Sequence, residues 1–203
     1  MQMPKLLRSI RFLLACTASF AALMGWLIAN RSVAQREEAT LRRLSCEHWH
    51  TFDYQDWLGT QHPKGPSWIR SLLHEHLFDR VATIGLHSPN RSDIESITTL
   101  ASLWHLSIAD DTALQDLNQI QIHPSITSLE FANTSLSSLD GIEKFDKLWR
   151  LDLFYNSNLV DIDAALTITS LKRIQFRGCS ETLARRIPEL KRRHPETEFF
   201  VVD

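Results

Sequence analysis

Histidines are the first residues of this sequence whose chemistry stands out, because a neutral imidazole is a common zinc ligand. The chain has nine histidines. Five of them fall in one segment: His48, His50, His62, His74 and His76. No Cys-x-x-Cys or His-Glu-x-x-His spacing accompanies them, and histidines two positions apart on a helix, as at 74 and 76, point in different directions. We therefore predict no metal site and no cofactor, and we keep a zinc-dependent cell-envelope enzyme built on this segment as an alternative hypothesis.

Nucleophiles and paired acids give no catalytic pattern either. The sequence has no Gly-x-Ser-x-Gly elbow and no glycine-rich phosphate loop, and it has only six glycines. The acid pairs Asp110 with Asp111 and Asp161 with Asp163 follow apolar segments, where Asp commonly forms turns. Three cysteines, at positions 16, 46 and 179, are too few and too scattered for a disulfide scaffold. We predict no catalytic residues and a protein that is not an enzyme.

The charge and size of the chain exclude a second class of function. It has 22 basic and 24 acidic residues and a formal net charge of -2, so no overall positive field attracts nucleic acid. Its 203 residues are 43% hydrophobic, which is enough to bury the core of one compact unit. We expect one folded unit that is monomeric and does not bind nucleic acid.

An apolar run near the N-terminus predicts a membrane anchor. Residues 12–29 carry no charge, and a helix of that length nearly crosses the hydrocarbon layer. Arg11 and Arg31 bracket the run, and Trp26 lies near its end, as in a single-pass span. Residues 1–11 are then a cytoplasmic tail. Two alternatives are a secretion signal cleaved near Ser32, Val33 and Ala34, and a lipoprotein signal at Cys16, which has too short an apolar stretch before it.

The positive-inside rule gives no clear preference for the side of the membrane on which the rest of the chain lies. Three Lys or Arg residues precede the span and four follow it closely. We favour the outer side of an inner or plasma membrane, because a short N-terminal tail commonly stays in the cytoplasm. Residues 30–45 contain no Gly or Pro, and Glu38 and Arg42 are spaced for an i,i+4 pair, so we predict that the helix continues as a juxtamembrane stalk.

A repeat of about 22 residues dominates the remaining sequence. Apolar residues spaced i, i+3, i+5 recur in five units whose starts step by 22, 23, 22 and 23 residues. The units are Val81-Ile84-Leu86, Leu103-Leu106-Ile108, Ile126-Leu129-Phe131, Leu148-Leu151-Leu153 and Leu171-Ile174-Phe176. The last two positions of each unit alternate with a polar residue, which predicts short half-buried strands side by side in one parallel sheet.

The segments between these strands have apolar residues at every third position, for example Leu136, Leu139, Ile142 and Phe145. A three-residue period aligns side chains on one line only in 3₁₀ or extended backbone, and not in an α-helix. Even His123 fits this period. Units of this size cannot bury their apolar edges alone, so they must stack on one another. The sequence therefore predicts an α/β solenoid with a parallel sheet and short 3₁₀ or extended convex segments.

The spacing over residues 81–178 resembles leucine-rich repeats, and LSSLDGIEKFDKLWRLDL at residues 136–153 resembles the 22-residue class. In that family an Asn often follows the strand and hydrogen-bonds the backbone of the turn. Asn133 and Asn156 fit this position, and Asp110 or Asp111 and Cys179 replace Asn elsewhere. The order of anchor, stalk and few repeats further resembles short membrane-anchored bacterial leucine-rich-repeat proteins.

Segments on either side of the repeats are predicted to cap the apolar edges. Residues 46–80 form the N-terminal cap, with a strand in EHWHTFDY and a helix starting near Pro66, whose Trp68 and Leu72 would cover the first repeat. Residues 179–203 form the C-terminal cap. Ser180 caps a helix over ETLARRIPELKRR, with Pro188 as a site for a kink, and EFFVVD supplies a last strand.

Polar and aromatic residues between the buried strand positions are the candidate binding site. In a solenoid these side chains point to the concave face, and the candidates are Trp104, His105, Glu130, Trp149, Arg150, Asp152, Arg173 and Gln175. Trp and Arg are enriched at protein-binding hot spots, and Trp104 and Trp149 occupy the same slot two repeats apart. The alternative is that both tryptophans pack on the aliphatic stems of neighbours. We therefore predict a non-catalytic protein-interaction module for a protein ligand, with a purely structural spacer as a further alternative.

Overall fold

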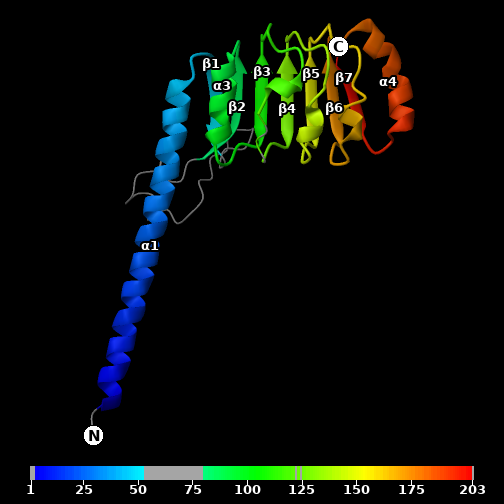
Figure 1. Ribbon diagram of the computed structural model, residues 1–203. Helices are drawn as coiled ribbons and strands as arrows, with labels where there is room; N and C mark the ends of the chain where they lie inside the picture. The colour runs from blue at the N-terminus through cyan, green and yellow to red at the C-terminus, as the bar shows by residue number, and fades with distance from the viewer. Residues whose placement is uncertain (1–2, 53–79, 122, 124, 203) are drawn as a thin grey trace.

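The computed structural model of the chain describes residues 3–52, 80–121, 123 and 125–202. It begins with one helix, α1 (Met3–Arg43), which runs without a break for 41 residues. Its apolar part has an 18-residue window of mean hydropathy 1.6, none of it buried, so by length and composition this helix can cross a membrane. Figure 1 shows this part of α1 projecting away from the rest of the molecule.

A seven-stranded open sheet follows, with its strands in the order of the chain. The strands are β1 (Glu47–Phe52), β2 (Val81–His87), β3 (His105–Ala109), β4 (Ser128–Ala132), β5 (Arg150–Phe154), β6 (Arg173–Arg177) and β7 (Glu198–Val202). β1 pairs antiparallel with β2, and every later pair is parallel. Leu106 pairs with Leu129, and Leu129 with Leu151, so the predicted apolar units do lie on neighbouring strands.

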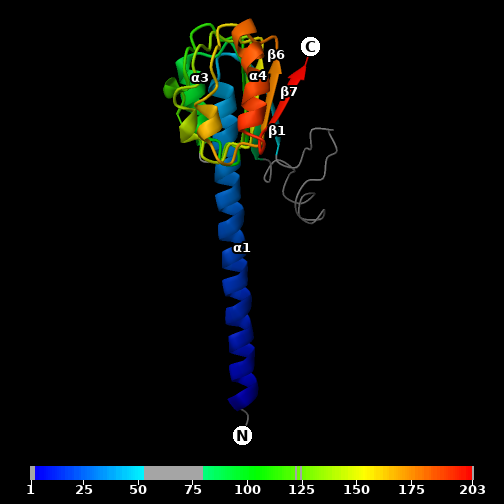
Figure 2. The same cartoon turned by 90° about the vertical axis from the view of Figure 1, so that its right-hand side faces the viewer.

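Short 3₁₀ helices form the crossovers on one side of the sheet, as the three-residue period predicts (Figure 2). They are η2 (Ile97–Thr99), η3 (Leu117–Gln119), η4 (Ile142–Lys144) and η5 (Ala165–Thr167). The prediction is wrong in the first crossover, where the α-helix α3 (Arg91–Ser96) precedes η2. Asn90 and Asp93 form a capping box that satisfies the free N–H groups at the start of α3 and so favours an α-helix there.

The core lies between the sheet and the crossovers. Aliphatic side chains of strands β2 to β6 and of the crossovers between them are almost fully buried in one continuous cluster. Phe131, Phe145 and Phe176 are the largest side chains within it. His123 also lies there, 6% exposed, and its Nε2 bonds the Leu100 carbonyl, so it fills an interior slot as its place in the period predicts. Each unit thus buries its apolar residues against its neighbours, which is the main favourable term in folding.

The turn after each of the strands β2 to β6 contains a residue in the left-handed backbone region. These residues are Ser88, Asp110, Asn133, Tyr155 and Gly178. The residue that bonds the turn backbone comes one position later: Asn156 donates to the carbonyls of Phe131 and Phe154. Thr134, and not Asn133, occupies that position in the preceding repeat, so the predicted equivalence of Asn133 and Asn156 is wrong. Asn133 instead supplies the positive φ, which Asn tolerates better than most residues.

The end of α1 closes the first edge of the core together with β1. Glu37 is buried, and its carboxylate accepts hydrogen bonds from the backbone N–H groups of Val81 (3.0 Å) and Ala101 (3.1 Å). Leu41 and Leu44 pack against the core cluster. The segment predicted to be a stalk therefore contributes to the N-terminal cap. The helix predicted from Pro66, with Trp68 and Leu72, lies outside the described residues.

The C-terminal cap has the predicted helix and strand. α4 (Glu181–Arg193) starts at Ser180, whose Oγ accepts from the Leu183 N–H at 3.2 Å. Its residues Leu183, Ile187 and Leu190 are buried against the last repeat, and the helix continues on both sides of Pro188. β7 then adds to β6 in parallel and forms the second edge of the sheet.

Candidate binding face

The side of the sheet opposite the crossovers, which we call the open face, carries two rows of side chains in cross-strand register. One row is Thr51, Thr83, His105, Ser128, Arg150, Arg173 and Glu198. The other is Trp49, Gly85, Ser107, Glu130, Asp152, Gln175 and Phe200. Side chains directly opposite each other on neighbouring strands are close enough to interact. The open face is therefore a polar and aromatic surface built on a fixed backbone ladder.

Aromatic rings gather at the β1 end of this face. The indole of Trp49 lies over Gly85, where a Cβ would come within 2.1 Å of the indole nitrogen, so only glycine admits the ring. The ring centroid of His105 lies 6.4 Å from that of Trp49 and 5.7 Å from that of Trp104. Burial, helped by the charge of Arg150, lowers the pKa of His105 to about 4. His105 is thus a neutral member of this cluster at neutral pH.

Two carboxylates lie side by side at the centre of the open face. Ser107 donates its hydroxyl to Glu130 at 3.1 Å, and Arg150 donates to both carboxylate oxygens of Asp152 at 3.1 and 2.9 Å. Burial raises the pKa of Glu130, and it also raises the pKa of Asp152 against the lowering effect of Arg150. Asp152 is 1% exposed and committed to Arg150. Among the described residues Glu130 forms no ion pair, so it is the acid that can receive an outside cation.

At the β7 end, charge and an aromatic ring again combine. Arg173 pairs with Glu198 at 3.1 Å, and its guanidinium lies 4.9 Å from the centroid of the Phe200 ring. Gln175 lies between Asp152 and Phe200 in the second row. This end offers a planar cation held over an exposed ring, a type of group found at many protein contacts.

The eight predicted site residues fall into two groups. His105, Glu130, Arg150, Asp152, Arg173 and Gln175 lie within the two rows. Trp104 and Trp149 instead lie at the starts of strands, on the rim of the open face, and are 43% and 40% exposed. Trp49 and Gly85 are not among the predicted site residues, yet both lie in the second row. The alternation of EHWHTF could have placed Trp49 on the face opposite His48 and His50, but the pairing of β1 with β2 was needed to bring it to His105.

No group of three or more His, Cys, Asp or Glu that could hold a metal ion occurs in the part of the chain that the structure describes. His48 and His50 stack with ring centroids 6.1 Å apart and pair with the buried positions of β2, which puts them on the side of the crossovers. Burial, and next the neighbouring His48, lower the pKa of His50. His62, His74 and His76 lie outside the described residues.

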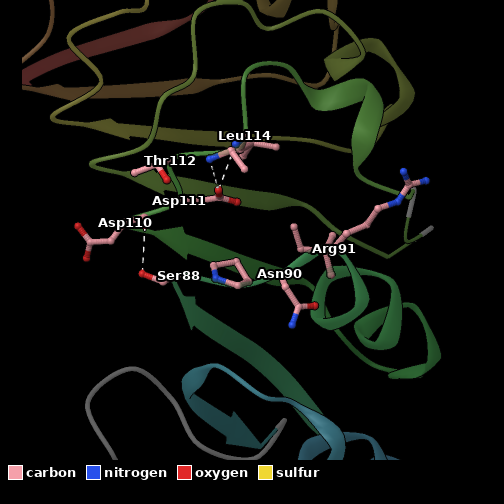
Figure 3. Close-up of a pocket in the computed structure, with 10 residues that line it drawn as sticks. Ser88, Asn90, Arg91, Asp110, Asp111, Thr112 and Leu114 are labelled. Atoms are coloured by element: carbon pink, nitrogen blue, oxygen red, sulfur yellow. Dashed lines mark hydrogen bonds between the residues drawn. The ribbon is translucent and has the colours of Figure 1, made fainter.

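A pocket of about 490 Å³ lies at the carboxyl ends of β2 and β3 (Figure 3). Its polar groups are used by the turns that line it. Asp111 accepts from the N–H groups of Ala113 (2.7 Å) and Leu114 (3.1 Å), and Ser88 donates to the Asp110 carbonyl (3.1 Å). Carboxylates that satisfy backbone N–H groups in this way act as turn formers, so the open face is the better candidate.

Comparison of the chain with protein-family models and with curated protein sequences found no match.

Proposed function

We propose that this chain is a membrane-anchored leucine-rich-repeat protein whose open face binds a protein ligand, without catalysis. In this proposal α1 spans an inner or plasma membrane once, and the repeats form a short monomeric solenoid on the outer side. The observation that carries the proposal is the pair of rows on the open face. These rows consist mainly of aromatic, charged and polar residues, whereas the other side of the sheet is aliphatic. The 22- and 23-residue steps, the 3₁₀ crossovers and the buried Asn156 support the repeat family.

The chemistry of the open face fits a protein ligand better than a small molecule. Its two rows extend over all seven strands, and the pocket described above lies outside them, whereas small-molecule sites are concave and mostly apolar. Trp49 and Arg173 with Phe200 flank a central region around Glu130, an arrangement of anchors with satisfied polar groups between them.

Site-specific photo-crosslinking in cells tests the open face directly. A photoreactive residue replaces Gln175 on the open face in one variant and the exposed Thr167 of η5, on the crossover side, in another. We expect a discrete protein adduct from position 175 and none from position 167. Adding Glu130→Arg should reduce the adduct at 175 by about tenfold or more, because a half-buried cation would then repel the positive group of the partner that Glu130 is proposed to receive.

The crosslinking experiment and a separate zinc measurement distinguish the proposal from its alternatives. Equal labelling from both positions, or none from 175, contradicts the proposal, and no adduct from either position favours a structural spacer. Stoichiometric zinc retained by the purified full chain, lost together with an enzymatic activity on chelation, favours the zinc-dependent enzyme.

A further inference from the structure

The direction in which the parallel strands run relative to α1 determines which ends of the strands lie nearest the apolar segment. Arg80, just before β2, donates to the side-chain oxygen of Asn30 at 2.8 Å. At the other end of β2, Asp93 of α3 accepts from the backbone N–H of Ser45, which follows α1, at 2.8 Å. β2 and the parallel strands therefore run in the same direction as the end of α1. The start of β2 lies beside the last part of α1, where the Val81 N–H bonds the carboxylate of Glu37, and the long Arg80 side chain reaches back along the helix to Asn30.

Asn30 directly follows the apolar run at residues 12–29. A helix rises about 1.5 Å per residue, so the start of β2, beside Glu37, lies roughly 12 Å or about two helical turns beyond the end of the predicted span, and the Arg80 side chain extends from it to Asn30. We call this border, formed by the starts of β2 to β7 and the end of α4, the membrane-facing edge. If α1 crosses a bilayer, this edge lies just above the lipid headgroups, which extend about 5–8 Å beyond the hydrocarbon core, and its long basic side chains can reach them.

Backbone hydrogen bonds hold the residues of this edge in one line. The N–H of Trp104 donates to Ala82, that of Thr127 to Trp104, that of Trp149 to Thr127 and that of Lys172 to Trp149, each at 2.8–2.9 Å. The line therefore contains two exposed tryptophans and one exposed lysine. In Figure 1 the strands lie side by side in a row that leads away from α1, so the edge extends along the surface that α1 would enter.

Basic side chains accumulate along the same edge. They are Arg80, Lys147, Lys172, Lys191, Arg192 and Arg193. The last three belong to the final turn of α4, and its cap His194 bonds Thr197 just before β7, which places that turn beside Lys172. Among the described residues, Asp146 and Glu196 are the acids in the turns of this edge. The opposite edge has Asp110 and Asp111 in its turns, so positive charge is concentrated on the side nearest the apolar segment.

We propose that the membrane-facing edge binds the anionic headgroup surface of the bilayer that α1 enters. Tryptophan prefers the membrane interface, and lysine and arginine are attracted to anionic lipids within a Debye length. This inference rests on the membrane anchor of the proposed function and is independent of the protein ligand. Trp104 and Trp149, at the rim shared with the open face, then contact lipid, while Glu130 and Gln175 stay free for a ligand.

The experiment uses the full chain in phospholipid nanodiscs that contain a headgroup-spin-labelled lipid. A fluorescent amino acid replaces Thr169, in the turn before β6, or Thr112, in the turn after β3 at the opposite edge; both positions are exposed. We expect quenching at 169 to be about twofold or more stronger than at 112, to rise when phosphatidylglycerol is mixed into phosphatidylcholine, and to fall at high salt.

A charge reversal on the edge and a matched control complete the test. Lys172→Glu with Arg192→Glu should abolish the effect of phosphatidylglycerol at 169, and Arg185→Glu, near the other end of α4, should leave it unchanged. Circular dichroism checks that each variant is folded. Equal quenching at 169 and 112, or a phosphatidylglycerol effect that survives the reversal, overturns the inference while the anchor stands. Release of the chain from membranes by an alkaline wash overturns the anchor and the inference together.

Discussion

At the β1 end of the sheet a single carboxylate, Glu37, accepts from two backbone N–H groups of the first repeat, whereas at the β7 end three aliphatic residues of α4 cover the last repeat. Both ends solve the same problem, since a stacked core leaves an apolar edge at each terminus. Among the described residues, the first end combines the hydrogen bonds of the buried Glu37 carboxylate with the packing of Leu41 and Leu44. The second depends on buried apolar area. The two should therefore fail in different ways when a side chain is removed.

The largest effect is expected at the apolar end. Ile187→Ala removes a side chain that is 4% exposed and leaves a cavity between α4 and the last repeat, so we expect the free energy of unfolding to fall by about 2–5 kcal/mol. Urea unfolding of the full chain in detergent measures this change. Glu189→Ala, at an exposed position of the same helix, is the control and should change stability by less than about 0.5 kcal/mol. Similar losses in both variants would mean that α4 does not cover the core.

The second effect is expected at the polar end. Glu37→Ala leaves the N–H groups of Val81 and Ala101 without an acceptor, which should cost about 1–3 kcal/mol. Amide hydrogen exchange should accelerate at these two positions more than in β6. Glu38→Ala removes the exposed ion pair with Arg42 and should cost less than about 0.5 kcal/mol. If Glu38→Ala matches Glu37→Ala, the carboxylate is not the group that closes this edge.

The smallest effect concerns Asp93, which links α3 to the end of α1. Burial on its own raises the pKa of Asp93, but the hydrogen bonds from the backbone of Ser45 and Asn90 outweigh it, and the pKa is lowered. A lowered folded pKa stabilises the fold above the unfolded value, near 3.9, and this stability is lost as the pH falls through the folded value.

Asp93→Asn should therefore cost about 1 kcal/mol at neutral pH and remove that part of the acid dependence. Urea midpoints from pH 7 down to about pH 3 measure the difference. Wild-type and variant curves that stay parallel over the whole range would show that Asp93 does not titrate with folding. Ile187→Ala, which changes no titratable group, should keep the wild-type acid dependence and so separates the two ends by their response to pH.

Local periodicity explains which parts of the fold could be predicted. The five apolar units, the later 3₁₀ crossovers and α4 follow from local spacings, and each is found where the spacing puts it, whereas the first crossover contains the α-helix α3. The α-helix α3 also had a local signal in Asn90 and Asp93, which the general period of the repeats obscured. The one-residue offset between Asn133 and Asn156 was hidden because the repeat alternates between 22 and 23 residues.

Contacts between distant segments explain what could not be predicted. Glu37 is one of two adjacent glutamates in a helix, and nothing local distinguishes it from Glu38, yet its partner Val81 lies 44 residues away. The same applies to the open face, where Trp49 reaches His105 only because β1 pairs antiparallel with β2. The alternation within each strand predicts that polar and aromatic side chains face away from the core. The register of the strands decides which of these side chains lie next to one another on the open face.

Because α1 is unbroken, the open face has a fixed rotation about the helix axis relative to the apolar segment. The helix that holds Glu37 in the cap is the same helix that contains the apolar segment. The number of residues between them therefore sets the rotation of the open face about the helix axis, relative to the apolar segment. A helix turns about 100° per residue. One residue inserted between Ala29 and Asn30 would therefore rotate the open face by about 100° relative to the apolar segment, whereas seven inserted residues would restore nearly the original rotation. A protein that bound one face of the apolar segment would therefore meet the open face at one fixed angle about the helix axis.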